Sequence, residues 1–222
     1  MIAVLFADRR GIYAGRPDVD LWDVRRDARR YPGPHPVVAH PPCSRWCRLA
    51  GLVEARWSHL DGESSQPTLD IGLERRASHA KGDDNGAFAS ALASVRRWRG
   101  VLEHPAYSDA WDAYGLPRPN RDGGWTQGAC GGWSAHVEQG RYGHAAKKAT
   151  WLYAYGVEPP ELLWGFDPEA RSKALVSWCG NHVSSDETRP RVGKKSASAT
   201  PPAFAELLLS IARSAINRHE SA

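Results

Sequence analysis

The sequence predicts an α/β protein, a minimal single domain in which a mostly parallel sheet lies between helical layers. Three short apolar runs of strand length, at 2–6, 35–40 and 101–105, are the first observation. Such continuous runs are typical of parallel strands that are buried on both faces. The second observation is a pair of segments with helical periodicity, at 86–100 and from Thr200 onward. Strands and helices that follow one another in this way indicate a layered α/β architecture.

The composition limits the classes of protein that the chain can belong to. Its 222 residues suffice for one sizeable core. The formal net charge of +4 is compatible with a polyanionic partner but does not single one out. No apolar run approaches the roughly 20 residues that cross a bilayer. The four cysteines follow no signal-peptide pattern, so we expect a cytoplasmic protein with no membrane association.

The two helices are predicted from apolar stripes and end signals. The stripe of the first helix consists of Phe88, Leu92, Val95 and Trp98. Gly100 is expected to stop this helix. The stripe of the second consists of Phe204, Leu207, Leu208 and Ile211. Thr200 is a plausible cap for this helix and Pro201 suits its first turn, so we expect it to begin there.

The remaining segments divide into a further strand and two long loops. The run "TWLYAY" (150–155) is rich in β-branched and aromatic residues and favours a strand. The segments at about 51–85 and 106–135 are rich in polar residues, glycine and proline. We expect both to form long irregular loops.

Three short motifs each follow an expected strand. Pro42-Cys43 comes first, Glu103 comes second, and Gln139 with Arg141 comes third. Functional residues of α/β sheets gather beyond the carboxyl ends of the strands. The motifs are therefore expected to lie together at one edge of the sheet.

In this order the motifs resemble those of the cytosine-5 DNA methyltransferases, which have a Pro-Cys loop, a Glu-Asn dipeptide and a Gln-x-Arg-x-Arg segment. The chain is similar to short, divergent bacteriophage methylase-like members through "AHPPCSRW", "LEHPAYS", "YGHAAKKATWLY" and "SASATPPAFAELL". The likeness extends over most of the chain. It implies a Rossmann-like, methyltransferase-type three-layer sandwich, encoded by a phage or prophage. It also implies DNA or a pyrimidine nucleotide as partner and S-adenosylmethionine as methyl donor.

The resemblance assigns chemical roles to three residues. Cys43 would add as a thiolate to C6 of the pyrimidine, because C5 is not nucleophilic enough to take a methyl group directly. Glu103 would hold the base edge, and Arg141 would support the base and its adduct. The target base would be flipped out of the duplex to reach them. Neighbouring cations such as Arg45 and Arg141 are expected to lower the pKa of Cys43.

The resemblance also implies two sets of binding residues. The cofactor is expected to contact Phe6, Ala7, Asp8, Asp20 and Asp27. The substrate is expected to contact Pro42, Ser44, His104, Gln139, His144 and Lys148. The chain departs from the family in three places. "LFADRRGIYAG" replaces the glycine-rich Phe-x-Gly-x-Gly turn, His104 stands for asparagine, and Gly143 stands for the second arginine.

Other interpretations of the same residues remain open. Cys43 could be a buried small residue or a zinc ligand. The potential zinc ligands are His40, Cys43, Cys47, Cys179 and His182. Asp20, Asp23 and Asp27 could be turn residues instead of ribose ligands. The pocket could also transfer another electrophile to C5 or act on a free nucleotide. From other classes, the chain could be an inactive nucleic-acid-binding module or a zinc-stabilised interaction protein.

Overall fold

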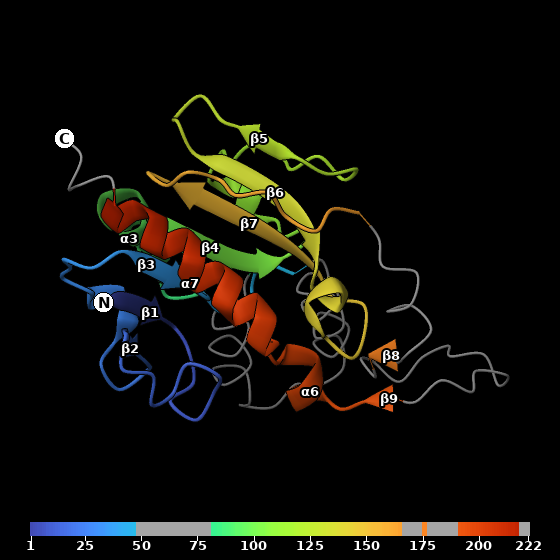
Figure 1. The fold of residues 1–222 in the computed structure, drawn as a ribbon, viewed down its shortest axis with the longest axis horizontal. Helices are drawn as coiled ribbons and strands as arrows, with labels where there is room; N and C mark the ends of the chain where they lie inside the picture. Colours follow the sequence, from blue (N-terminus) through green and yellow to red (C-terminus); the bar gives the residue numbers. More distant parts are fainter. Residues whose placement is uncertain (48–80, 166–174, 177–190, 218–222) are drawn as a thin grey trace, which may run out of the picture.

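The computed structural model describes residues 1–47, 81–165, 175–176 and 191–217. A seven-stranded sheet forms the centre of the fold (Figure 1). Its strands are β1 (Ile2–Leu5), β2 (Val19–Trp22), β3 (Val37–Ala39), β4 (Gly100–Pro105), β5 (Trp125–Gln127), β6 (Trp133–Glu138) and β7 (Ala149–Tyr155). The helices are η1 (Ala28–Arg30), α3 (Ala87–Trp98), α4 (Ala110–Ala113), η3 (Gln139–Tyr142), α6 (Lys194–Ser198) and α7 (Pro202–Asn217). Two short strands, β8 (Leu175–Val176) and β9 (Arg191–Val192), pair separately.

The central sheet is mixed. Its strand order is β2-β1-β3-β4-β7-β6-β5. Strands β1 to β4 run parallel to one another. Strand β7 is antiparallel to both of its neighbours, β4 and β6, and β5 is antiparallel to β6. As a result β6 points in the same direction as β4, although β7 separates them.

The prediction of a mostly parallel sheet is wrong for the half that contains β5, β6 and β7. More residues of the sheet pair antiparallel than parallel. The connections 128–132 and 139–148 are shorter than the roughly dozen residues that a parallel crossover needs, so they favour antiparallel neighbours. Strand β7 is buried along most of its length, as a central parallel strand would be, and its apolar sequence therefore did not reveal its direction.

Helices cover both faces of the sheet. Figure 1 shows α7 crossing one face diagonally, with α3 on the far side. Helix α7 packs on β1, β3 and β4, and α3 packs on β3, β4 and β7. Each helix contributes to a separate core. Phe204 and Leu208 of α7 meet Val4 and Val38 in one core, while Phe88 of α3 belongs to the other. This arrangement confirms the α/β class.

Helix α3 begins and ends for identifiable reasons. The side chain of Asp84 accepts hydrogen bonds from the backbone N–H groups of Ala87 (3.1 Å) and Phe88 (2.8 Å), which caps the first turn. The helix ends at Trp98, and Arg99 follows with a positive φ of 66°. Gly100, expected to stop the helix, is instead the first residue of β4. Glycine is required there because of a close approach to β3.

The strand register aligns three strand ends. Leu5 of β1 pairs with Ala39 of β3, and Ala39 pairs with Leu102 of β4. The next residues along these strands, Phe6, His40 and Glu103, therefore lie level with one another at the carboxyl edge. This confirms that the predicted strand ends converge at one edge.

The two expected loops have different outcomes. The segment 106–135 is not wholly irregular, because it contains α4, β5 and the first residues of β6. Most of the segment 51–85 lies outside the described residues. Within the part of the chain that the structure describes, no helix is long and apolar enough to cross a membrane.

Gly100 offers a test of the β3–β4 pairing. A Cβ atom at this position would lie 2.0 Å from the backbone oxygen of Val37, its partner in β3. We expect Gly100→Ala to lower the free energy of unfolding by more than about 3 kcal/mol, because backbone atoms must separate. Gly115→Ala is the matched control, since Gly115 also has a positive φ (59°) but faces open space, and should cost only about 1 kcal/mol. Urea denaturation measures both, and equal losses would contradict the proposed clash.

Candidate active site

A chain of hydrogen bonds between polar side chains crosses the carboxyl edge of the sheet. His40 Nδ1 lies 3.0 Å from Glu103 Oε2, and the Tyr13 hydroxyl lies 3.0 Å from His40 Nε2. On the other side of the carboxylate, Gln139 Nε2 donates to Glu103 Oε1 (3.1 Å) and to Thr150 Oγ1 (2.9 Å). With its proton on Nδ1, neutral His40 donates to Glu103 and accepts from Tyr13. Glu103 therefore connects the parallel and antiparallel halves of the sheet.

Glu103 is a buried carboxylate that keeps its charge. Its relative exposure is only 8%, and burial by itself would raise its pKa. The hydrogen bond from His40 and the charge interactions with His40 and Lys148 outweigh this effect, so the pKa of Glu103 is lowered. The side chain is therefore an ionised hydrogen-bond acceptor at neutral pH.

Cys43 lies close to this carboxylate in a turn after β3. Its backbone oxygen accepts hydrogen bonds from Trp46 and Cys47, both at 3.0 Å, which fixes the start of the turn. The side chain is half-buried. Burial raises the pKa of the Cys43 thiol, and the nearby Cys47 and Glu103 raise it further, while Lys148 lowers it. The thiol is therefore mainly protonated at neutral pH.

The expectation that Arg45 and Arg141 would lower the pKa of Cys43 is wrong in its result, because the pKa is raised. The physical reason is that loss of hydration disfavours the thiolate more than the neighbouring positive charge favours it. The residue types around Cys43 do not indicate how deeply its side chain is buried. The sequence therefore could not reveal whether burial or the neighbouring positive charge has the larger effect on its pKa.

Lys148 is the cation whose charge acts on both Cys43 and Glu103. It is half-buried directly before β7. Its Nζ donates to the backbone oxygens of Ser198 (3.2 Å), the last residue of α6, and Ala199 (2.9 Å), which follows it. Burial lowers the pKa of Lys148, although Glu103 and Cys43 raise it in part. The ammonium group is thus held between the candidate site and the C-terminal helix.

Two of the expected site residues have other contacts. Arg141 is exposed on η3, where its Nε donates to the backbone oxygen of Gly165 (3.3 Å). His144 is buried. Its Nδ1 bonds to the backbone of Ala146, and its Nε2 lies 3.2 Å from the backbone oxygen of Ser196. His144 therefore connects the loop before β7 to α6.

Three further expected substrate contacts lie in different surroundings. Pro42 and Ser44 are exposed on either side of Cys43. His104 is 1% exposed and packs against Phe88 and Trp111 in the core beneath α3. It follows Glu103 in the strand, so its side chain points to the opposite face of the sheet. The structure thus brings Gln139 and Lys148 to Glu103 but places His104 in the core.

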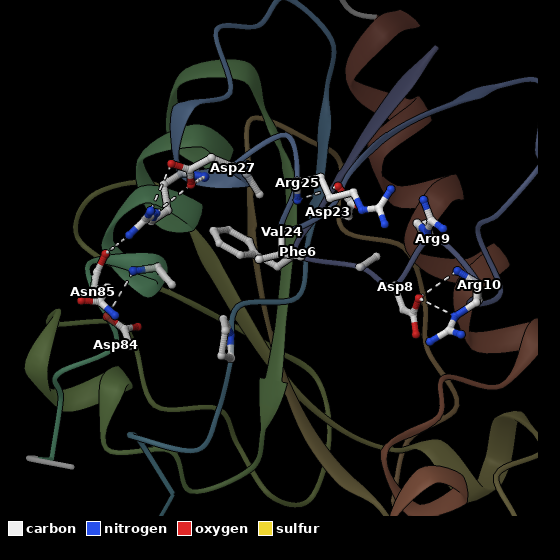
Figure 2. Close-up of a pocket in the computed structure, with 15 residues that line it drawn as sticks. Phe6, Asp8, Arg9, Arg10, Asp23, Val24, Arg25, Asp27, Asp84 and Asn85 are labelled. Atoms are coloured by element: carbon white, nitrogen blue, oxygen red, sulfur yellow. Dashed lines mark hydrogen bonds and ion pairs between the residues drawn. The ribbon is translucent and has the colours of Figure 1, made fainter. Parts of the chain in front are cut away.

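A cavity of about 760 Å³ lies beyond the ends of β1, β2 and β3 (Figure 2). Its size is within the range of small-molecule sites. Four of the five expected cofactor contacts line it, namely Phe6, Ala7, Asp8 and Asp27. Pro42, beside Cys43, is also part of the wall. The cavity and the buried carboxylate therefore share the same edge of the sheet.

The three aspartates near β2 have different roles. Asp20 does not belong to the cavity wall as described, and its carboxylate bonds to Trp22 Nε1 (2.8 Å) and Arg26 (2.5 Å). Asp27 caps η1 and pairs with Arg29, which agrees with turn chemistry. Asp23, directly after β2, lines the cavity. Its Oδ1 accepts the backbone N–H groups of Arg25 (2.9 Å) and Arg26 (3.2 Å).

The turn after β1 is made without the expected glycine. Phe6 has a positive φ of 61°, a conformation that glycine adopts at lower cost. Gly11 follows in a tight turn, where its N–H donates to the oxygen of Asp8 (2.8 Å). The chain therefore makes at Phe6 the positive-φ turn that glycine would make, but with a side chain at this position.

No family model, curated protein or solved structure matches this chain. The functional argument accordingly rests on the residues of the site.

A zinc site would need several ligands around Cys43. In the portion of the chain that is described, no three His, Cys, Asp or Glu side chains are grouped so that they could hold a metal ion. His40 already uses both ring nitrogens in bonds to Tyr13 and Glu103. Cys179 and His182 lie outside the described residues.

Three residues of this site were not identified as functional from the sequence. The sequence pattern indicates His40 only as a potential metal ligand, and no motif indicates Tyr13 or Thr150. The strand register could have indicated His40. Because Ala39 of β3 pairs with Leu102 of β4, His40 lies beside Glu103. Tyr13 comes from the loop between β1 and β2, and no local pattern indicates its position.

The buried side chain of His104 should make the stability of the protein depend on pH. Burial lowers the pKa of His104 from 6.5 to about 4. The unfolded chain therefore binds a proton at this residue before the folded chain does, and stability falls as the pH drops from about 6.5 to about 4. We expect this residue to cost about 3 kcal/mol at pH 4 relative to pH 7.

The comparison is His104→Leu against the wild type, by urea denaturation at pH 7 and at pH 4.5. The variant should lose less stability on acidification, while titration of other groups cancels in the difference between the proteins. The same pH dependence in both would show that His104 is not the titrating group.

Proposed function

We propose that the chain is a DNA (cytosine-5) methyltransferase-like enzyme that modifies a pyrimidine base through a cysteine adduct. The observation that carries this proposal is that Glu103 is hydrogen-bonded to His40, three residues before Cys43, and to Gln139, so that three separate parts of the chain meet at one edge of the sheet. Cys43, Glu103 and Lys148 also interact there through their charges. A nucleophile, a base-edge acceptor and a cation are the groups that the reaction requires.

The finer fold that we propose is a Rossmann-like, methyltransferase-type sandwich. Its parallel part has the order β2-β1-β3-β4, in which the direction of strand addition reverses between β1 and β3. Open α/β sheets bind ligands beyond the carboxyl ends of the strands at such a switch point. The cavity of Figure 2, with Phe6 after β1 and Pro42 after β3 in its wall, supports this assignment.

Cys43 would attack C6 of the base. A sulfur–carbon bond forms there as the thiol proton leaves to solvent, and the ring electron pair makes C5 nucleophilic. After C5 has been alkylated, loss of the C5 proton and of the Cys43 thiolate restores the aromatic ring. The cysteine is regenerated and is not consumed.

Glu103 and Gln139 would hold the base during this reaction. Each Glu103 oxygen has a lone pair left after bonding to His40 or Gln139, and can accept from the exocyclic amino group of cytosine. Gln139 Oε1 is buried and has no hydrogen-bond partner in the described residues. It therefore offers a further acceptor beside Glu103. Lys148 would stabilise the negative charge that develops on the ring.

The cavity fits an adenosyl cofactor in size and in the carboxylate of Asp23. Asp23 would accept the ribose hydroxyls, and Phe6 and Ala7 would line the apolar side. When bound, S-adenosylmethionine supplies an electrophilic methyl group. The position of Asp23 directly after β2 is comparable to that of the acidic residue that binds ribose in dinucleotide folds.

A second candidate is an inactive nucleic-acid-binding module of the same fold. The raised pKa of Cys43 favours it, because a thiol that stays protonated is a weaker nucleophile. The two candidates differ in whether Cys43 forms a covalent bond.

Covalent trapping tests the nucleophile. The protein is incubated with S-adenosylmethionine and DNA that contains 5-fluorocytosine, in which fluorine blocks the elimination that releases the enzyme. We expect a denaturation-resistant complex with the wild type and with Cys47→Ser, and none with Cys43→Ser. Trapping that survives Cys43→Ser would sink the assignment of the nucleophile.

The rate of trapping should also depend on pH. Because the pKa of Cys43 is raised above the ordinary value of 9.0, the thiolate is a minor species from pH 7 to 9. We expect the rate to rise about tenfold per pH unit through this range. A trapping rate that is already constant above pH 7 would show that the pKa of Cys43 is not raised.

Asp23→Asn tests the cofactor site. The substitution keeps the side-chain oxygen that accepts the backbone N–H groups of the turn but removes the charge. We expect affinity for S-adenosylhomocysteine, measured by calorimetry, to fall about tenfold. Asp112→Asn is the control. Asp112 lies on α4 in an exposed ion pair with Arg118, and this variant should bind like the wild type. No binding by the wild type at millimolar ligand would exclude this cofactor.

A further inference from the structure

A second cavity, of about 250 Å³, lies beyond the carboxyl end of β6. It is lined by Tyr107, Arg121, His136, Glu138, Lys147, Ala149 and Gly165. It is distinct from the cavity at β1 and β3, with which it shares no residue. Its volume is below the range of drug-sized ligands, so it suits a group as small as one nucleobase.

One oxygen of a buried carboxylate in this cavity has no hydrogen-bond partner among the described residues. Glu138 is 4% exposed, and its Oε2 accepts no hydrogen bond from the described residues. Its Oε1 lies 3.9 Å from His136 Nε2, which is too far for a hydrogen bond. Leaving a buried carboxylate oxygen without a donor is costly, so the geometry indicates a ligand that donates to Glu138.

His136 presents a donor beside these oxygens. Trp151 Nε1 donates to His136 Nδ1 at 3.1 Å, and an indole nitrogen can only donate. Nδ1 is therefore the acceptor, and the ring proton of His136 is on Nε2. The cavity thus offers two carboxylate acceptors next to one N–H donor.

This pattern complements the Watson–Crick edge of guanine. Guanine has two adjacent donors, the N2 amino group and N1–H, which match the oxygens of Glu138, and an acceptor, O6, which matches His136. Adenine and cytosine each place one amino donor beside an acceptor, so they use only one oxygen of Glu138. Uracil and thymine place carbonyl oxygens on both sides of N3–H, where one of them would face the carboxylate.

The rest of the cavity suits a nucleotide. Tyr107 is 42% exposed and lies against His136 and Trp151, with ring centroids 6.0 and 5.3 Å apart, so it provides an aromatic surface for a base. Arg121 and Lys147 add positive charge for a phosphate. The cavity lies at the same edge of the sheet as the candidate active site, because β6 points in the same direction as β4, but Glu138 and Glu103 lie on opposite faces of the sheet. A nucleic-acid strand bound at both places would therefore cross this edge.

We propose that this cavity binds an unpaired guanine through Glu138 and His136, as a neighbour of the modified cytosine on the same strand. The binding of guanine stands on the cavity alone, whereas its relation to a modified cytosine rests on the proposed function. A free Watson–Crick edge implies that the strand is single-stranded or locally opened when it binds.

Calorimetry with mononucleotides tests the guanine preference. Guanosine 5′-monophosphate should bind the wild type at least about tenfold more tightly than the adenosine, cytidine and uridine monophosphates. Inosine 5′-monophosphate, which lacks the N2 amino group, should lose about tenfold. Equal affinities for all five nucleotides, or no binding at millimolar concentration, would overturn the proposal.

Glu138→Gln identifies the group responsible. It preserves the size of the side chain but replaces an acceptor by a donor, so affinity for guanosine monophosphate should fall at least about tenfold. Glu158→Gln, outside both cavities, should leave it unchanged. His136→Phe, which keeps an aromatic ring but lacks the Nε2 donor, should also weaken binding. Unaltered binding by the Glu138 and His136 variants would refute the assignment.

The two proposals can fail separately. Cys43→Ser should bind guanosine monophosphate like the wild type, because Cys43 is not part of this cavity. Guanine binding without covalent trapping would retain the cavity and reject the cysteine mechanism. Covalent trapping without guanine binding would retain the cysteine mechanism and reject the guanine site.

Discussion

The position of Glu103 is the constraint on which the rest of the site depends. Its carboxylate is held between His40, directly after β3, and Gln139, directly after β6. These residues belong to the parallel and the antiparallel halves of the sheet. The hydrogen-bonded site therefore exists only when both halves have assembled, so folding and the arrangement of polar groups are coupled. A buried charge of this kind is tolerated because each of its oxygens accepts a hydrogen bond.

The same carboxylate opposes ionisation of its neighbour. An ionised Glu103 raises the pKa of the Cys43 thiol, and Lys148 counteracts it. The resting arrangement therefore favours a protonated thiol and limits its reaction with oxidants, since the thiolate is the reactive form. A ligand that satisfied Glu103 with hydrogen-bond donors would weaken this repulsion and make Cys43 more reactive when the site is filled.

Patterns within one segment predicted most of the elements, and contacts between segments account for the errors. The runs at β1, β3, β4 and β7 have enough apolar residues to be identified as strands, and the stripe of α3 identifies the helix. Direction is not encoded in such runs, because β7 is covered on both faces in the same way as a parallel strand. For the candidate site, the order of Cys43 and Glu103 along two strands was sufficient to place them together. Their pKa values were not predictable, because they depend on burial and on Lys148, whose position follows from the β6–β7 connection.

The two hydrogen bonds that Lys148 makes to Ser198 and Ala199 give the sheet edge a mechanical connection to the C-terminal helix. These carbonyl groups lie just before α7, whose residues Phe204 and Leu208 complete one core. An anion that draws the ammonium toward the site must lengthen at least one of these bonds. Occupancy of the site and docking of α7 are then thermodynamically linked, and the linkage acts equally in both directions. Looser attachment of this helix would free the ammonium group from these carbonyl groups and so strengthen anion binding at the site.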